Sequence, residues 1–141
     1  MDNPDDVYNL SRFVEAQDRV YAKVLEELRR GRKTSHWMWF VFPQVRGLGR
    51  SEMATRYAMS GRAEAEAYLR HPVLSARLEE CTRLVNGIDD SASAIFGFPD
   101  DLKFRSSMTL FASVAGGGVF REALDKFFGG EEDAQTVALL K

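Results

Sequence analysis

The chain is poor in cysteine and histidine, and it lacks any long apolar run. It contains one cysteine, Cys81, which cannot form an internal disulfide and therefore indicates a reducing compartment. Its two histidines, His36 and His71, give no recognised metal spacing, so we expect no metal and no cofactor. No charged-then-apolar leader opens the chain, and no stretch approaches the roughly 20 apolar residues of a membrane span. These absences predict a cytoplasmic protein without a membrane partner.

An excess of one charge is also missing. Lys and Arg number 19 against 21 Asp and Glu, which gives a formal net charge of −2. Such a balance provides no general attraction to nucleic acid, and we do not expect nucleic acid as a partner. The chain has no Gly-x-Ser-x-Gly nucleophile elbow, internal repeat or low-complexity tract. Its 45% hydrophobic and 28% charged residues are typical of a globular protein, and its length fits a single domain over residues 1–141.

Apolar periodicity predicts an all-α protein. We expect a single compact globule of seven or eight short-to-medium helices, not a regular up-down bundle. The first helix should run from about residue 6 to residue 30, where apolar residues recur in steps of three and four. The run from Trp37 to Phe42 fits either a buried strand or a short helix. Ser35 as N-cap and the helical surroundings favour one or two helical turns that end before Pro43.

Capping residues predict further helix boundaries. Ser51, Ser91 and Asp133 are suitable N-caps, and Asp100 or Asp101 should cap a helix that runs to about Ala115. Pro72 suits the first turn of a helix that ends near Asn86, and Cys81 lies on the inward face of that helix. We therefore interpret Cys81 as a core residue and not as a nucleophile.

Positively charged residues and both tryptophans are concentrated in one segment. Residues 29–56 contain seven Lys or Arg residues, one acid, Glu52, and both tryptophans of the chain. This segment contains a glycine turn that is flanked by arginines and followed by the start of a helix. The turn consists of Arg46, Gly47, Leu48, Gly49, Arg50 and Ser51. Glycines allow backbone N–H groups to point at one anion, and arginines grip phosphate or carboxylate through paired hydrogen bonds. The alternative interpretation is a tight surface loop with solvated arginines and a serine cap, since the motif matches no established phosphate-binding pattern.

The neighbouring side chains are open to two interpretations each. Trp37 and Trp39 lie on different faces of a helix, so one can stack on a ligand ring while the other packs in the core. His36 is either an acid–base group or a helix-start histidine bonded to the backbone. The side-chain amide of Gln44 either forms hydrogen bonds with the polar edge of a ligand or holds the loop in place.

A second polar set lies between residues 100 and 109. It comprises Lys103, Arg105, Ser106 and Ser107, and adjacent serines are mediocre helix formers. The serines either bond the carbonyls of the preceding turn or line a cleft opposite the arginine loop.

Together these features favour a site for a small anionic ligand, a phosphate-bearing compound such as a nucleotide or an ADP-ribose-like molecule. In this hypothesis Arg46, Arg50 and the backbone of residues 47–51 hold phosphate, and Trp37 or Trp39 stacks on a ring. Lys103, Arg105 and Ser107 close the far wall. If the site is catalytic, His36 and Asp100 form the first acid–base pair to test, in a reaction of hydrolase or glycosidase type. The alternative is a non-enzymatic protein-interaction module that uses the same Trp/Arg surface.

The chain also resembles a known family through six long strings that extend over nearly its whole length. These strings are residues 12–17, 31–40, 42–44, 47–51, 68–74 and 103–111. They are similar to a bacterial family catalogued as domain of unknown function 1810, with Ser75 at a position where glycine is expected. The resemblance implies a compact all-helical fold and carries no established activity.

A genome label and a second, looser similarity are connected with this resemblance. Some members of the family carry the genome label calpastatin, but true calpastatin is disordered and this chain has the periodicity of a packed globule. The order of motifs is also loosely similar to that of glycosidases linked to NAD and ADP-ribose, which is a reason to test such ligands.

Overall fold

The computed structural model describes residues 6–141, and the regular secondary structure of this part of the chain consists of ten helices, with no strand. The all-α class is confirmed, whereas the expected number of seven or eight helices is too low. The helices are α1 Ser11–Asp18, α2 Tyr21–Arg29, α3 Met38–Val41, α4 Glu52–Arg56, α5 Arg62–Arg70, α6 Pro72–Asn86, α7 Ala92–Phe96, α8 Asp100–Ala115, α9 Val119–Phe128 and α10 Ala134–Leu139.

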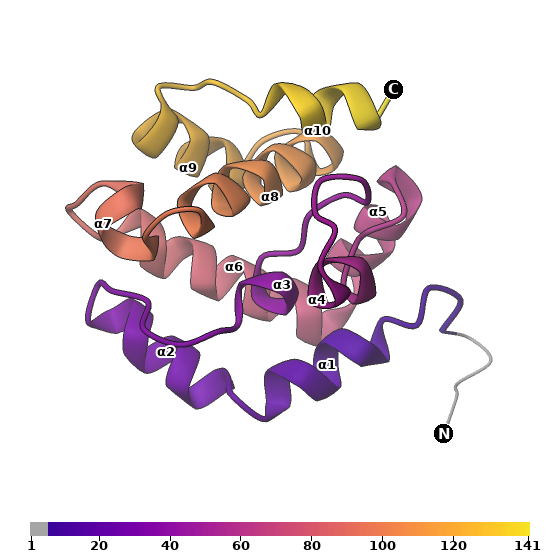
Figure 1. Cartoon of the computed structure of the whole chain (residues 1–141), viewed down its shortest axis with the longest axis horizontal. Coiled ribbons are helices and arrows are strands. Elements are labelled where there is room, and N and C mark those ends of the chain that lie inside the picture. Colours follow the sequence, from indigo (N-terminus) through magenta and orange to yellow (C-terminus); the bar gives the residue numbers. More distant parts are fainter. Residues whose placement is uncertain (1–5) are drawn as a thin grey trace.

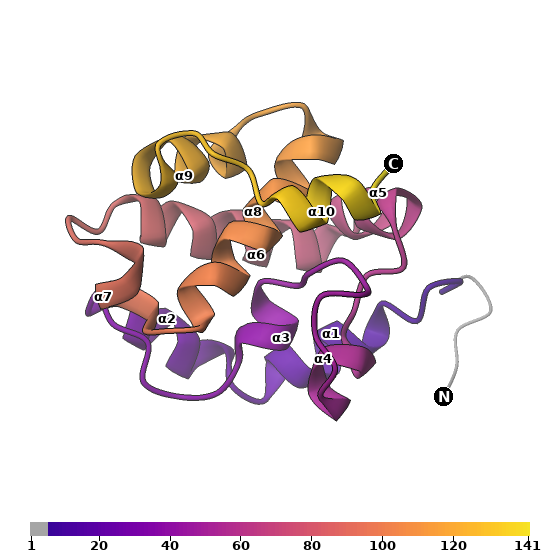
Figure 2. The ribbon, with the colours of Figure 1, turned by 45° about the horizontal axis from the view of Figure 1, so that its top comes forward.

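Helix α8 forms the centre of the molecule. It contacts α3, α5, α7, α9 and α10, and it crosses between the α1–α2 pair and the α9–α10 pair (Figures 1 and 2). Every residue from Ser106 to Ala112 is buried. A helix that is enclosed around its whole circumference belongs in the interior, and α8 therefore provides the frame on which the other elements are placed.

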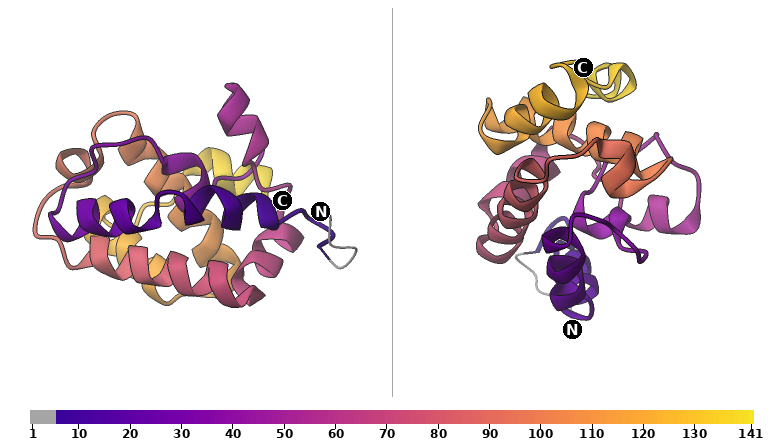
Figure 3. Two further views of the ribbon diagram at one scale, coloured as in Figure 1. Left: turned by 90° about the horizontal axis from the view of Figure 1, so that it is seen from below. Right: turned by 90° about the vertical axis from the view of Figure 1, so that its left-hand side faces the viewer.

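The helix expected over residues 6–30 is in fact two helices. A bend at Val20, whose φ is −130° and whose N–H donates to the Gln17 carbonyl, separates α1 from α2. Figure 3 shows the two helices in succession alongside α6. The bend lets Phe13 on α1 and Leu28 on α2 both reach the core. Neither proline nor glycine marks the bend, which is why the periodicity did not reveal it.

The start of α8 also differs from the expectation. Pro99 occupies the N-cap position, and Asp100 and Asp101 lie in the first turn instead of capping it. The Asp100 carboxylate pairs with the Nζ atoms of Lys33, at 2.7 Å, and Lys103, at 3.4 Å. The Asp100 carboxylate thus forms ion pairs with lysines and does not accept a backbone N–H as an N-cap would.

The remaining boundaries agree with the capping residues. Ser51, Ser91 and Asp133 each accept a backbone N–H in the first turn of the following helix, and Pro72 is the first residue of α6. Helix α3 confirms the helical interpretation of the segment before Pro43, although Ser35 does not cap it.

Aromatic rings fill the core against α8. The Phe104 ring centroid lies 4.7 Å from that of Phe96 and 5.1 Å from that of Phe42. Cys81 is fully buried, and burial raises the pKa of its thiol to about 12. The core interpretation of Cys81 is therefore confirmed.

Candidate functional site

The arginine loop and α4 form one excursion from the body of the molecule. Its two ends are joined where the Arg46 N–H donates to the Met59 carbonyl at 2.7 Å and the Met59 N–H donates to the Gln44 carbonyl at 2.8 Å. The excursion comprises residues 47–58 and is closed at its base by an isolated parallel bridge between Val45 and Met59. It therefore keeps a defined position in front of α8.

Two glycines shape this loop for different reasons. Gly47 has φ +107°, a conformation that other residues rarely adopt, and its backbone approaches the Leu139 side chain of α10. Gly49 has no room for a side chain, because an added Cβ would lie 2.6 Å from the Cβ of Ala54. The loop folds back tightly onto α4 as a result. Ser51 completes the turn, since its hydroxyl accepts the Ala54 N–H at 3.1 Å.

A cleft of about 360 Å³ opens between this loop and α8. It brings together Gln44, Gly49, Arg50 and Ser51 from the loop side and Lys103, Arg105 and Ser106 from α8. The expected juxtaposition of the arginine loop and the serine-bearing helix is thus present for these seven residues. Residues whose side chains have no role in the sequence hypothesis also line the cleft, namely Leu48, Ala54, Pro99, Leu102, Asp133 and Gln135.

The cleft carries an excess of positive charge. Arg50, Lys103 and Arg105 face it, and the accompanying carboxylate is that of Asp133. Asp133 already accepts the N–H of Thr136 at 3.0 Å and its hydroxyl at 2.6 Å as the cap of α10. Both bonds end on its Oδ2 atom, and its single negative charge balances only one of the three cations.

The three cations differ in how they are paired. Arg105 donates to the Glu131 carboxylate at 3.2 Å, and Lys103 lies 3.4 Å from that of Asp100. Arg50 is exposed and forms no ion pair with any described residue. Among these three cations, the Arg50 guanidinium is therefore the one whose hydrogen-bonding capacity is not used by a described carboxylate.

The two serines of α8 have separate environments. Ser106 lines the cleft and donates its hydroxyl to the Leu102 carbonyl at 3.1 Å, so both sequence interpretations apply to it. Ser107 is fully buried, does not line the cleft, and its hydroxyl has no hydrogen-bond partner. We therefore leave Ser107 out of the candidate site.

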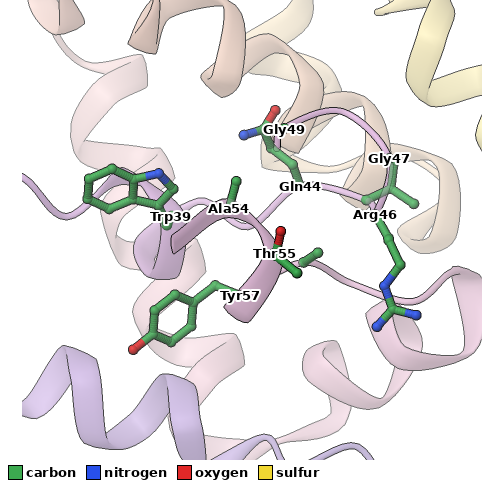
Figure 4. Close-up of a pocket in the computed structure, with 10 residues that line it drawn as sticks. Trp39, Gln44, Arg46, Gly47, Gly49, Ala54, Thr55 and Tyr57 are labelled. Carbon is green, nitrogen blue, oxygen red and sulfur yellow. The ribbon is translucent and has the colours of Figure 1, made fainter. Parts of the chain in front are cut away.

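A small cavity of about 40 Å³ lies behind the cleft, and the two share Gln44, Gly49 and Ala54. Trp39 lines this cavity and is half-buried, with the Lys103 ammonium 5.3 Å from its ring centroid. Arg46 also lines it, but in Figure 4 its guanidinium extends away from Gln44 and Trp39. Arg46 lines the small cavity and Arg50 lines the cleft, so the two arginines do not belong to one site.

Trp37 lies in the core and not in the cleft. It is 1% exposed, and its indole N–H donates to the buried Glu27 carboxylate at 3.0 Å. A ring enclosed in this way has no free face for a ligand, and it also offers no surface to a protein partner. Both sequence hypotheses lose Trp37 as a contact for this reason.

The acid–base pair suggested for a catalytic site is not formed. His36 is exposed, and no hydrogen bond or ion pair among the described residues joins it to Asp100. Asp100 is instead occupied by Lys33 and Lys103. The geometry gives these two residues no shared chemical role.

Asp133 and Gln135 are the cleft residues that sequence reasoning was least able to find. They come from the last helix, more than 80 residues after the arginine loop. The sequence marks Asp133 as a cap and gives no signal that α10 packs beside α8. The sequence hypothesis includes Leu48 only through its backbone, as one residue of the range 47–51.

The described residues also bear on metal sites and membrane spans. No group of three or more His, Cys, Asp or Glu side chains in residues 6–141 is placed to hold a metal ion. Among the helices of this range, none has the length and apolar character that crossing a membrane requires.

Comparison with known proteins gives a family and no activity. A family model described as "Protein of unknown function (DUF1810)" matches residues 7–140. The crystal structure of the conserved hypothetical protein Rv1873 from Mycobacterium tuberculosis is 57% identical in sequence and has a TM-score of 0.94, over 96% of this chain and 98% of that chain. No curated protein matches. The chain therefore belongs to the DUF1810 family of proteins of unknown function, as its motifs predicted.

Proposed function

We propose that the cleft between residues 47–51 and α8 binds a small phosphate-bearing ligand of the nucleotide or ADP-ribose-like class. The observation that carries the proposal is the unpaired Arg50 guanidinium in the same cleft as the Lys103 ammonium. A guanidinium offers phosphate two parallel hydrogen bonds, and an ammonium adds a compact charge. The two side chains together match what a phosphate group requires.

The loop backbone supports the same function. The N–H groups of Gly49 and Arg50 donate no hydrogen bond to any described residue. Unpaired N–H groups in a glycine-containing loop are suitable donors to an anion. A phosphate in the cleft can therefore be held by backbone and side-chain donors at once.

The test is thermal unfolding in the presence of inorganic phosphate, AMP, ADP and ADP-ribose. Binding at a concentration 100 times the Kd stabilises the folded state by about 2.7 kcal/mol, which raises the melting temperature measurably. Arg50→Ala should abolish this shift.

Arg46→Ala is the matched control, because Arg46 is an exposed arginine of the same loop that does not line the cleft. It should retain the wild-type shift. The proposal fails if none of the four compounds raises the melting temperature, or if Arg46→Ala and Arg50→Ala behave alike.

A further inference from the structure

The cleft has an apolar part beside its basic part. Leu48, Pro99 and Leu102 line it, and Leu102 remains 47% exposed. When a ligand covers apolar side chains that are in contact with water, the free energy of the complex falls, and binding is favoured. A bare phosphate group cannot cover them, so a ligand that fills this cleft needs an apolar part in addition to its anion.

Gln44 lies where the cleft meets the small cavity behind it. It lines both, and its backbone carbonyl accepts the Met59 N–H that closes the excursion. Its side-chain amide, in contrast, makes no hydrogen bond with any described residue. Figure 4 shows this amide beside Gly49 and directed away from the Arg46 guanidinium. The loop is therefore tied down by backbone bonds, and the side chain of Gln44 is not needed for that purpose.

A half-buried amide without a protein partner influences which ligands can bind. It presents hydrogen-bond donors and an acceptor side by side. A ligand that covers it expels the water on which it depends, and an unpaired buried amide opposes binding. A ligand with a matching donor and acceptor avoids this cost. Planar heterocycles such as nucleobases carry such an edge on a flat apolar body.

We infer that Gln44 is a specificity-determining residue, and that the ligand joins its phosphate to a planar ring with an adjacent hydrogen-bond donor and acceptor. This inference rests on the proposed phosphate site. The ring lies against Leu48, Pro99 and Leu102, and its polar edge meets the Gln44 amide. The cleft volume of about 360 Å³ is near the lower end of the range of ligand sites, about 300 to 1,000 Å³. This size fits a single ring with its phosphate, as in a nucleoside monophosphate.

The experiment is calorimetric titration of the full chain with AMP, GMP, CMP, UMP and ribose 5-phosphate. Ribose 5-phosphate has the anion and the sugar but no ring edge. At least one of the four nucleotides should bind about ten-fold or more tightly than ribose 5-phosphate. Gln44→Leu, which has a similar volume and no amide, should reduce this preference and leave ribose 5-phosphate binding unchanged.

The outcomes separate this inference from the proposed function. Equal binding of all four nucleotides and ribose 5-phosphate overturns the role of Gln44 and leaves the phosphate site intact. The same holds if Gln44→Leu weakens both kinds of ligand equally. If no phosphate compound binds, the proposed function fails and the inference fails with it. Should Gln44→Leu unfold, Gln44→Asn replaces it, since this variant keeps an amide but withdraws it from the cleft and should also lose the preference.

Discussion

Glu27 shows how a single buried charge organises the chain around it. Its carboxylate accepts hydrogen bonds from the N–H of Thr34 at 2.7 Å and the N–H of Ser35 at 3.0 Å. It also accepts from the Ser35 hydroxyl and from the indole N–H of Trp37. Burial by itself raises the pKa of a carboxylate, but these four donors outweigh burial and lower the pKa of Glu27 to about 2. The segment between α2 and α3 is thus wrapped around an ionised carboxylate.

This arrangement predicts a specific dependence of stability on pH. The pKa of Glu27 is lower in the folded protein than its ordinary value of 4.5, so its contribution is fully present above pH 4.5 and is lost as the pH falls toward 2. The loss should amount to about 3 kcal/mol in the free energy of unfolding. Urea unfolding between pH 2 and pH 7 measures it.

Two variants identify the source of this pH dependence. Glu27→Gln should be less stable than the wild type at pH 7, and its stability should change less with pH in the acid range. Glu66→Gln, at an exposed glutamate of α5, should keep the wild-type profile. An unaltered acid profile in Glu27→Gln would show that other carboxylates are responsible.

Phe104 and Phe98 differ in burial although both belong to the region where α8 begins. Phe104 is 0% exposed and packs against Phe42 and Phe96, whereas Phe98 is 80% exposed. Phe104→Ala should lower the free energy of unfolding by about 3 to 5 kcal/mol, because it leaves a cavity in the core. Phe98→Ala should change it by less than about 0.5 kcal/mol. Denaturant unfolding of both variants checks the difference, and comparable losses would contradict the described core.

At the scale of elements, the excursion from residue 47 to residue 58 acts as one unit. Its base is closed by the hydrogen bonds of Met59, and next to this base Gly47 lies close to Leu139 of α10. The Cβ of Ala54 fills the space next to Gly49. The position of the cleft wall therefore depends on close contact between the loop and α4.

Gly49→Ala should disturb this contact, because its new Cβ would lie 2.6 Å from that of Ala54. We expect a loss of about 1 to 3 kcal/mol in the free energy of unfolding and weaker binding of any phosphate ligand that binds the wild type. Thermal unfolding with and without ligand measures both effects.

A second substitution tests the stated cause. In the double variant Gly49→Ala/Ala54→Gly the colliding methyl group is absent, and part of the stability should return. Gly61→Ala is the control, since an added Cβ at Gly61 meets nothing within 4 Å. If the double variant is no more stable than Gly49→Ala, the collision is not the reason for the loss.

At the scale of the whole molecule, buried polar contacts tie the first helix to distant parts of the chain. The Arg12 guanidinium of α1 donates to the Ala58 carbonyl at 3.1 Å and to the Glu64 carboxylate at 2.9 Å. The Gln17 amide, also on α1, donates to the Phe40 carbonyl at 2.7 Å and to the Tyr68 hydroxyl at 3.1 Å. These bonds join α1 to α3 and α5, so we expect the chain to unfold as one unit.

Cys81 reports on this cooperativity. It is 0% exposed, and burial raises the pKa of its thiol to about 12, so the native protein should not react with a thiol reagent. Reaction should follow global unfolding. The labelling rate should therefore rise with urea in parallel with the loss of helical circular dichroism. Rapid labelling in native buffer would show that α6 opens locally.

The sequence by itself determined the helical class, most helix starts and the family. These features depend on residues a few positions apart, because a capping hydroxyl meets the backbone within its own first turn and an apolar stripe repeats along its own helix. The loop glycines and the concentration of arginines near residue 50 were visible for the same reason.

Only the tertiary structure decided which side chains share a cleft. Arg50 and Lys103 line one cleft because the fold places α8 beside an excursion that begins more than 50 residues earlier, whereas the Arg46 guanidinium extends away from Gln44 and Trp39. The burial of Trp37, with its hydrogen bond to Glu27, and the bend at Val20 likewise arise from packing between elements. Contacts of this kind depend on the shape of the whole core, and no local pattern of residues specifies that shape.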